Sequence, residues 1–129
     1  MTCVLDTHAL VWHLTDSERL GRNAGALLCN PASRVVIPTI VMAELKYLHH
    51  RGRVPLSYAE VMASIESDER CMLFPLTEPV LALLPVELEI HDAVICATAL
   101  LLHEAGADAV GVLTCDRQIA GSGIVRSVW

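Results

Sequence analysis

The chain has 129 residues, of which 53% are hydrophobic and 19% charged, so it can fold around one core and is not a disordered tail. Nine Lys and Arg stand against fifteen Asp and Glu, which gives a formal net charge of −6. This balance excludes a protein that coats nucleic acid through a basic surface, but it leaves open one that handles nucleic acid through metal ions.

Two further features of the composition concern the cellular compartment. The longest apolar run, 93–102, is far shorter than the roughly 20 residues of a membrane span, and the N-terminal segment lacks the basic region of a signal peptide. The five cysteines are an odd number without a C-x-x-C pair, which is typical of reduced thiols rather than of disulfides or a zinc site. These features predict a cytoplasmic protein without a membrane anchor.

Short apolar runs alternate with helical patterns along the whole chain. In chain order we predict strand Thr2–Leu5, helices Asp6–Leu14 and Glu18–Cys29, strand Arg34–Ile37, helices Thr39–His50 and Ser57–Asp68, strand Cys71–Phe74, a short helix after Thr77, helix Asp92–Ala105, and strands Val110–Thr114 and Ile124–Val128. Such alternation is typical of a parallel sheet with helices on both faces. We therefore expect a three-layer α/β fold with about five parallel strands, in a single domain covering 1–129.

Local signals set several of these boundaries. Thr39 is a candidate N-cap, the run from Ser57 to Glu60 has the pattern of a capping box, and Gly106 suits the position just after a helix. Near the end of the chain, 120–123 has the composition of a plain glycine turn.

Two acidic residues directly follow predicted strands. Asp6 follows the first strand and Asp116 comes shortly after the fourth, so both fall at the carboxyl edge of the predicted sheet, where functional residues of such sheets gather. For either residue alone, a helix N-cap or a turn explains an Asp at least as well.

Two further acids lie in predicted helices. Glu44 falls on the broad apolar face of the helix from Thr39, where an unpaired carboxylate costs several kcal/mol of desolvation; the alternative is a side chain that reaches the rim of that face. Asp92 opens the most apolar helix of the chain, where N-capping is the alternative.

Together the four carboxylates predict a metal site. At an effective dielectric near 20, each pair of carboxylates about 4 Å apart would cost about 4 kcal/mol, and nearby Arg117 is the one cation next to these motifs. Such a cluster requires divalent cations or raised pKa values. An all-oxygen set suits Mg²⁺ or Mn²⁺, which can support phosphodiester hydrolysis.

Two other features have weaker functional interpretations. The basic cluster at 49–53 contains Arg51 and Arg53, which could contact RNA phosphates, although a solvated helix end explains them as well. Trp12 is interpreted as a core or dimer-contact residue, because the aromatic content of 4% is low for a base-stacking protein.

Four segments resemble the PIN-domain ribonucleases, and most of all the VapC-type toxins of bacterial and archaeal toxin–antitoxin pairs. They are Val4–Leu10, Ala43–Leu45, His91–Leu100 and Leu113–Asp116. They occur in family order and at family-like spacing over the whole chain.

The resemblance implies a function and a set of site residues. It places the family's acidic quartet, which is both catalytic and metal-binding, on Asp6, Glu44, Asp92 and Asp116, with supporting hydroxyls at Thr7 and Thr114. It further implies bound Mg²⁺ or Mn²⁺, cleavage of RNA, a homodimer, and a small VapB-like antitoxin whose basic segment covers the acidic pocket.

Other readings remain to be weighed against this one. The main rival is a non-catalytic PIN-like interaction module, and the presence of all four acids disfavours it. A haloacid-dehalogenase phosphatase needs Asp-x-Asp after the first strand, whereas here Asp6 is followed by Thr7 and His8. A receiver domain would need a Lys late in the chain, and the only Lys is Lys46.

Overall fold

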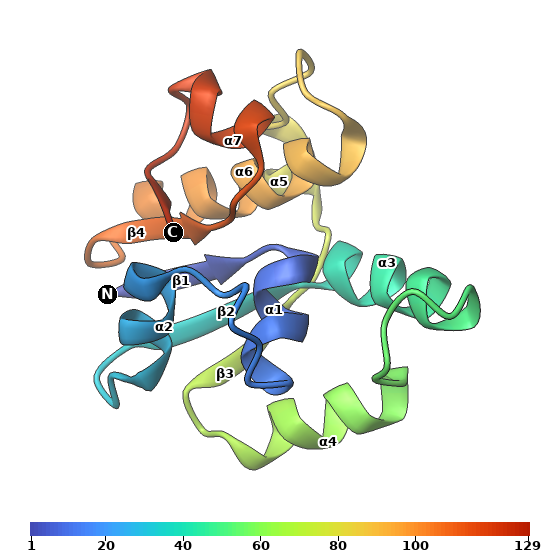
Figure 1. Ribbon diagram of the computed structural model, residues 1–129. Helices are drawn as coiled ribbons and strands as arrows, with labels where there is room; N and C mark the ends of the chain where they lie inside the picture. Colours follow the sequence, from blue (N-terminus) through green and yellow to red (C-terminus); the bar gives the residue numbers. More distant parts are fainter.

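The computed structural model describes residues 1–129 and is built around a five-stranded sheet (Figure 1). The strands are β1 (Thr2–Leu5), β2 (Arg34–Pro38), β3 (Cys71–Phe74), β4 (Val110–Leu113) and β5 (Ser127–Val128). They lie in the order β3-β2-β1-β4-β5, and every neighbouring pair is parallel. The predicted α/β class with a parallel sheet is confirmed.

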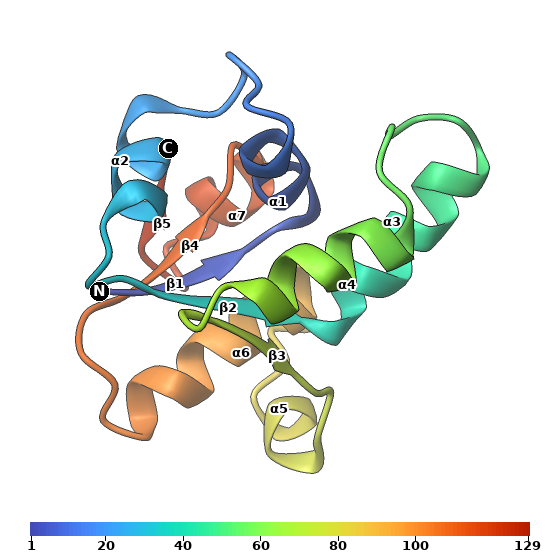
Figure 2. The same ribbon diagram turned by 90° about the horizontal axis from the view of Figure 1, so that it is seen from below.

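Helices cover both faces of this sheet. They are α1 (Thr7–Leu14), α2 (Arg22–Cys29), α3 (Thr39–His50), α4 (Tyr58–Ser67), α5 (Glu78–Ala82), α6 (Ile90–Glu104) and α7 (Arg117–Ser122). Figures 1 and 2 show α1 and α2 on one face and α5 and α6 on the other, which gives the three layers. None of the helices is both long and apolar enough to cross a bilayer.

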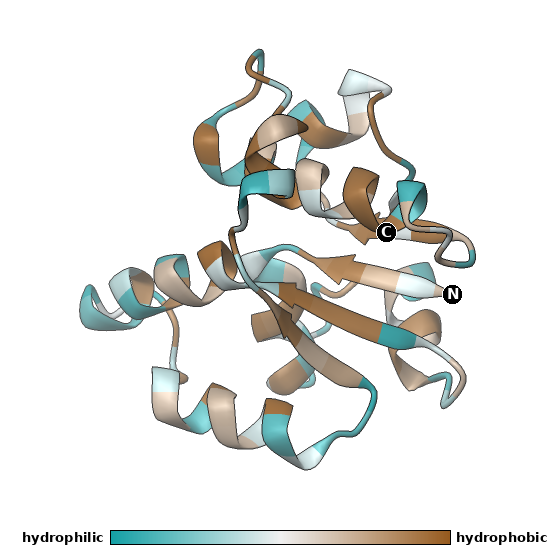
Figure 3. Cartoon of the chain, turned by 180° about the vertical axis from the view of Figure 1, so that it is seen from behind, coloured by the Kyte–Doolittle hydropathy of each residue, from teal (hydrophilic) through white to brown (hydrophobic).

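The central strands are apolar on both sides because both of their faces are covered. All four residues of β1 are buried, and so is every residue of β2 after Arg34. Continuous burial of this kind is typical of parallel strands between helical layers. The main core contains 23 buried apolar residues, and the strands through it are mostly brown in Figure 3.

The register of the sheet brings the ends of β1 and β4 together. Leu5 pairs with Leu113, and the Asp6 N–H donates to the Leu113 carbonyl oxygen at 3.3 Å. Val4 pairs with Val36 on the other side. The residues that follow β1, β2 and β4 therefore share one edge of the sheet.

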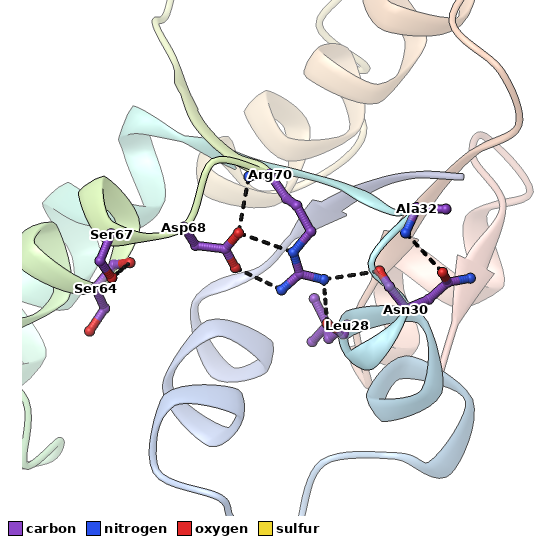
Figure 4. A network of polar contacts seen from close by, with 7 residues as sticks. All are labelled: Leu28, Asn30, Ala32, Ser64, Ser67, Asp68 and Arg70. Atoms are coloured by element: carbon purple, nitrogen blue, oxygen red, sulfur yellow. Dashed lines mark hydrogen bonds and ion pairs between the residues drawn. The ribbon is translucent and has the colours of Figure 1, made fainter.

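A polar network ties the start of β3 to the end of α2 (Figure 4). The Arg70 guanidinium donates to both Asp68 carboxylate oxygens, from Nε at 3.0 Å and from Nη2 at 2.7 Å. Its Nη1 donates to the carbonyl oxygens of Leu28 at 2.8 Å and Asn30 at 3.0 Å. This is the one ion pair of the chain, and it lowers the pKa of Asp68 to about 2.

Two helix starts differ from the prediction. The helix expected from Glu18 begins only at Arg22, because Leu20 closes a turn with Ser17 and Gly21 is extended as the N-cap. A Cβ on Gly21 would lie 2.4 Å from the backbone of Trp129, so this position requires glycine. α3 is capped by Pro38 rather than by Thr39, which is already its first residue.

The last part of the chain also differs. The predicted glycine turn at 120–123 is mostly helix α7, which ends with Gly123 at a φ of +69°. Burial of Ile119 and the cap provided by Asp116 stabilise this short helix. The strand predicted for Ile124–Val128 shortens to Ser127–Val128. The capping box at Ser57 and the left-handed Gly106, with φ +82°, are confirmed.

Candidate metal centre

The four predicted acids line one cleft of about 540 Å³ at the carboxyl edge of the sheet. Each comes from a different part of the fold: Asp6 joins β1 to α1, Glu44 lies in α3, Asp92 lies in the first turn of α6, and Asp116 precedes α7. The fold thus gathers residues that are far apart in the sequence. The remaining lining residues are Thr7, His8, Trp12, Ile95, Cys115, Arg117 and Gln118.

Asp6 is the most deeply buried of the four, with 8% of its surface exposed. Its Oδ1 accepts a hydrogen bond from the Ala9 N–H at 2.7 Å, so it does cap α1. Burial raises the pKa of Asp6; hydrogen bonds from Thr114 and Ala9 lower it in part, and the Glu44 charge raises it further. Capping and a functional role are therefore compatible at this residue.

Glu44 is held in place by a hydroxyl from α1. Its Oε2 accepts a hydrogen bond from Thr7 Oγ1 at 2.8 Å. Glu44 is half-buried, while Val41 and Leu45 beside it on α3 are fully buried. The carboxylate thus leaves the apolar face at its rim and joins the cleft.

Asp92 does not cap its helix. α6 starts at Ile90, with Glu89 as an N-cap that makes no side-chain hydrogen bond, so the predicted start at Asp92 is wrong by two residues. Burial raises the pKa of Asp92, and the charges of Asp116, Asp6 and Glu44 raise it further, in that order. The other three carboxylates are thus near enough to repel Asp92.

Asp116 caps α7 with a single carboxylate oxygen. Its Oδ1 accepts from the N–H groups of Gln118 at 2.7 Å and Ile119 at 3.2 Å, which leaves Oδ2 outside the cap. Thr114 Oγ1 accepts from the Asp116 N–H at 3.0 Å, and the same hydroxyl lies near enough to Asp6 to lower the pKa of that carboxyl. One buried hydroxyl therefore connects two of the acids.

The donor set suits a hard divalent cation by its chemistry. The four acids, with Thr7 and Thr114, offer only carboxylate and hydroxyl oxygens. Two of the acids have raised pKa values, and no cation forms an ion pair with any of the four. As the side chains stand, they do not form a group of three or more metal ligands. Binding an ion would have to draw the carboxylates closer together.

The two predicted RNA-binding arginines differ in position. Arg53 lines a second cavity, which adjoins the acidic cleft and shares lining residues with it. The Arg51 guanidinium lies over the Tyr47 ring, 5.6 Å from its centre, and lines neither the acidic cleft nor this second cavity.

Sequence reasoning missed part of the cleft wall. Trp12 packs against the core as predicted, but it also lines the cleft with His8. The four-residue spacing of His8 and Trp12, directly after Asp6, places them on one helix face and could have indicated this. Cys115 and Gln118 are exposed on the loop and helix that follow β4, and no motif singled them out.

Comparison with known structures gives the same fold. The crystal structure of VapBC2 from Rickettsia felis, bound to a DNA fragment from the promoter, matches with a TM-score of 0.67 and 13% identity, over 99% of this chain and 98% of that one. VapBC-1 from nontypeable Haemophilus influenzae matches with a TM-score of 0.65 and 18% identity, over 99% and 97%. No curated protein matches the chain by sequence.

The sequence itself carries the family assignment. The family model of the PIN domain matches residues 3–121, which include all four acids, both threonines and every strand but β5. The chain therefore belongs to the PIN-domain family.

Proposed function

We propose that this protein is a VapC-type toxin, a metal-dependent endoribonuclease that hydrolyses RNA phosphodiester bonds. The observation that carries this proposal is the convergence of four carboxylates in one cleft without an ion-paired cation. Membership of the PIN-domain family supports it, and so does the likeness in fold to two VapBC proteins. Such a toxin would act on RNA in the cytoplasm.

In this proposal Asp6, Glu44, Asp92 and Asp116 hold Mg²⁺ or Mn²⁺. When bound, the ion supplies the positive charge and Lewis acidity that hydrolysis of a phosphodiester needs. Thr7 positions Glu44 through their 2.8 Å hydrogen bond. Thr114 positions Asp6 together with the backbone of Asp116.

A cleavage assay with a matched pair of variants tests the proposal. Wild-type protein should cut RNA in Mn²⁺ or Mg²⁺ and stop when EDTA is added. Glu44→Gln keeps an acceptor for Thr7 but loses the charge, so cleavage should fall on the order of 100-fold or more, since even residues that only orient metal ligands cost about 10- to 100-fold. Glu66→Gln, on the exposed face of α4, should cleave like wild type.

The alternative is a PIN-like interaction module without catalysis. The observation that favours it is that Asp6 and Asp116 both cap helices and the acids do not yet form a metal-ligand group. A wild-type protein that cuts no RNA in Mn²⁺, free of host nuclease, would decide for this alternative.

A VapB-like antitoxin is the proposed partner. A pocket of four negative charges attracts a guanidinium, which pairs with carboxylates in a two-pronged geometry. A basic segment placed there should bind less tightly in high salt and should compete with Mn²⁺ for the same oxygens. Partner affinity that changes with neither salt nor Mn²⁺ would show that inhibition happens elsewhere.

A homodimer is also part of the proposal. Large apolar side chains are exposed between α5 and the start of α6: Leu81 at 50%, Val86 at 88% and Ile90 at 62%. Large apolar side chains that are exposed close together in the sequence are candidates for an interface, because contiguous exposed apolar surface often marks one. Light scattering on the purified wild-type chain should give twice the monomer mass. The Val86→Asp variant should give the mass of one monomer.

A further inference from the structure

A second cavity adjoins the acidic cleft. It also has a volume of about 540 Å³ and shares three lining residues with the cleft, namely His8, Trp12 and Glu44. Beyond these, α1, α3 and the segment at 53–55 form its walls. A chain molecule that reaches the acids can therefore continue into this second cavity without leaving the surface.

The charge of the second cavity is opposite to that of the cleft. Arg19 and Arg53 line it, and both are exposed and free of ion pairs. Other arginines of the chain also form no ion pair, but only Arg19 and Arg53 line this cavity, whereas Arg117 lines the acidic cleft. Two unpaired guanidiniums beside a metal-binding cleft suit the phosphates of a polyanion.

An aromatic cluster stands where the two cavities meet. The rings of His8 and Trp12 have centroids 5.3 Å apart, and the Trp129 ring meets Trp12 edge-on at 5.6 Å. Trp129 is itself fixed, because Asn23 Nδ2 donates to its backbone oxygen at 2.8 Å and Gly21 leaves room for it. Trp12 is therefore a braced, half-buried ring that lines both cavities.

We propose that this second cavity binds the nucleotide next to the scissile phosphate of single-stranded RNA. The base packs against Trp12 and His8, and the phosphate on the far side contacts Arg53 and Arg19. This site rests on the proposed ribonuclease function and deepens it. A basic protein segment fits the cavity less well, because Arg19 and Arg53 would repel the positive side chains of such a segment.

Tryptophan fluorescence tests the base contact. The chain has two tryptophans, so Trp129→Phe leaves Trp12 as the only one, and Trp12→Phe leaves only Trp129. Short single-stranded RNA, added with Ca²⁺ to slow cleavage, should quench Trp129→Phe protein and leave Trp12→Phe protein unchanged. Equal quenching of the two variants, or quenching of Trp12→Phe alone, would overturn the site.

Two arginine variants test the phosphate contact. Arg53→Ala should raise KM for RNA by roughly 10- to 150-fold, the loss expected for one charged hydrogen bond, with kcat changed less than about twofold. The salt dependence of binding should also weaken by about 0.7 in the log–log slope. Arg34→Ala, which removes an exposed arginine that lines neither cavity, should match wild type.

The outcomes separate this site from the proposed function. A wild-type protein that neither binds nor cleaves RNA would remove both. Normal cleavage with equal KM values for Arg34→Ala and Arg53→Ala would leave the ribonuclease function standing and would overturn the site. A loss of partner-protein affinity in Arg53→Ala without any change in KM would also overturn it and would assign the cavity to a protein.

Discussion

The Arg70 network and the acidic cleft differ in how their carboxylates are balanced: the network pairs its carboxylate with a cation, and the cleft does not. At the start of β3, the Asp68 carboxylate is bound by a guanidinium that also reaches two carbonyl oxygens of the neighbouring segment. In the cleft, Asp6 and Asp92 lie near two further carboxylates and no cation pairs with them. The pKa of Asp68 is lowered to about 2, whereas the pKa values of Asp6 and Asp92 are raised.

This difference separates a charge that stabilises the fold through an ion pair from charges that the fold leaves without a counter-ion. A carboxylate with a lowered pKa stabilises the folded state at neutral pH, and one with a raised pKa destabilises it. Raised carboxylate pKa values in a cleft are a physical mark of a functional site. Removal of the Asp68 charge should therefore lower stability and spare activity, whereas removal of the Asp6 charge should spare stability and abolish activity.

The largest expected effect is on RNA cleavage by Asp6→Asn. Asn keeps an oxygen that can accept from the Ala9 N–H but removes a ligand charge from the cleft. Cleavage should fall by about 100-fold or more, in line with the loss expected for a metal ligand. Above the ordinary carboxyl pKa of 3.8 the variant should be at least as stable as wild type without metal, and any gain should vanish below that pH.

Asp68→Asn is the matched control for this variant. It removes the charge that binds Arg70, so urea unfolding should show a loss of about 1–2 kcal/mol, while RNA cleavage per folded molecule stays at the wild-type level. A stable, fully active Asp6→Asn protein, prepared free of host nuclease, would remove Asp6 from the mechanism.

Removal of the Arg70 guanidinium should have the largest effect on stability. Arg70→Ala leaves the Leu28 and Asn30 carbonyl oxygens without their donor and frees Asp68, so unfolding should cost about 2 kcal/mol less than in wild type. Arg34→Ala, an exposed arginine at the start of β2 with no ion pair, provides the control and should change stability by less than about 0.5 kcal/mol. Equal losses in the two variants would contradict a structural role for the network.

Metal binding should stabilise the protein through the cleft and not through the network. A ligand that binds only the folded state at 100 times its Kd adds about 2.7 kcal/mol, so millimolar Mn²⁺ should raise Tm by several degrees. The shift should shrink in Asp6→Asn and persist in Asp68→Asn. A Tm that neither Mn²⁺ nor EDTA moves would count heavily against the metal site.

The pH dependence of stability should carry both signatures. Asp68 has a folded pKa of about 2 against an ordinary value of 3.8, so its contribution is present above the ordinary value and is lost as pH falls through that window. Asp6 and Asp92 act in the opposite sense, because burial first, and the neighbouring carboxylates second, raise their pKa values, and protonation removes both penalties. Asp68→Asn should therefore flatten the loss of stability between about pH 4 and pH 2 in unfolding measurements.

The sequence predicts the sheet well because its strands are short apolar runs with no competing pattern. Val4, Val36 and Val112 lie in strands as expected, and the structure adds that these strands are neighbours in the sheet. The helix boundaries were harder, since they depend on tertiary contacts. Gly21 ends the turn before α2 because Trp129 packs against it, and nothing near Gly21 in the sequence signals that contact.

The acids were predictable in position but not in their bonding. A place after a strand is enough to expect Asp6 and Asp116 at one edge of the sheet. Sequence reasoning set helix capping and function as alternatives, whereas Asp6 caps α1 and still lines the cleft. The low aromatic content of 4% argued against base stacking, but composition does not show position, and the two tryptophans are in contact beside the cleft.

The smallest expected effect concerns the hydroxyl that connects two of the acids. The Thr114 hydroxyl lowers the pKa of the Asp6 carboxyl, and it accepts from the Asp116 N–H. Thr114→Val removes both interactions with little change in volume, so the pKa of Asp6 should rise. The acid limb of the pH–rate profile should then move to higher pH, by less than about one unit, since a single neutral hydrogen bond contributes about 1 kcal/mol.

Thr98→Val is the control, because buried Thr98 bonds only to the Val94 carbonyl oxygen within α6. The pH–rate profile of this variant should coincide with that of wild type. An acid limb that stays in place in Thr114→Val, or moves equally in Thr98→Val, would mean that Asp6 does not set the pH dependence of cleavage, even where Asp6→Asn abolishes activity.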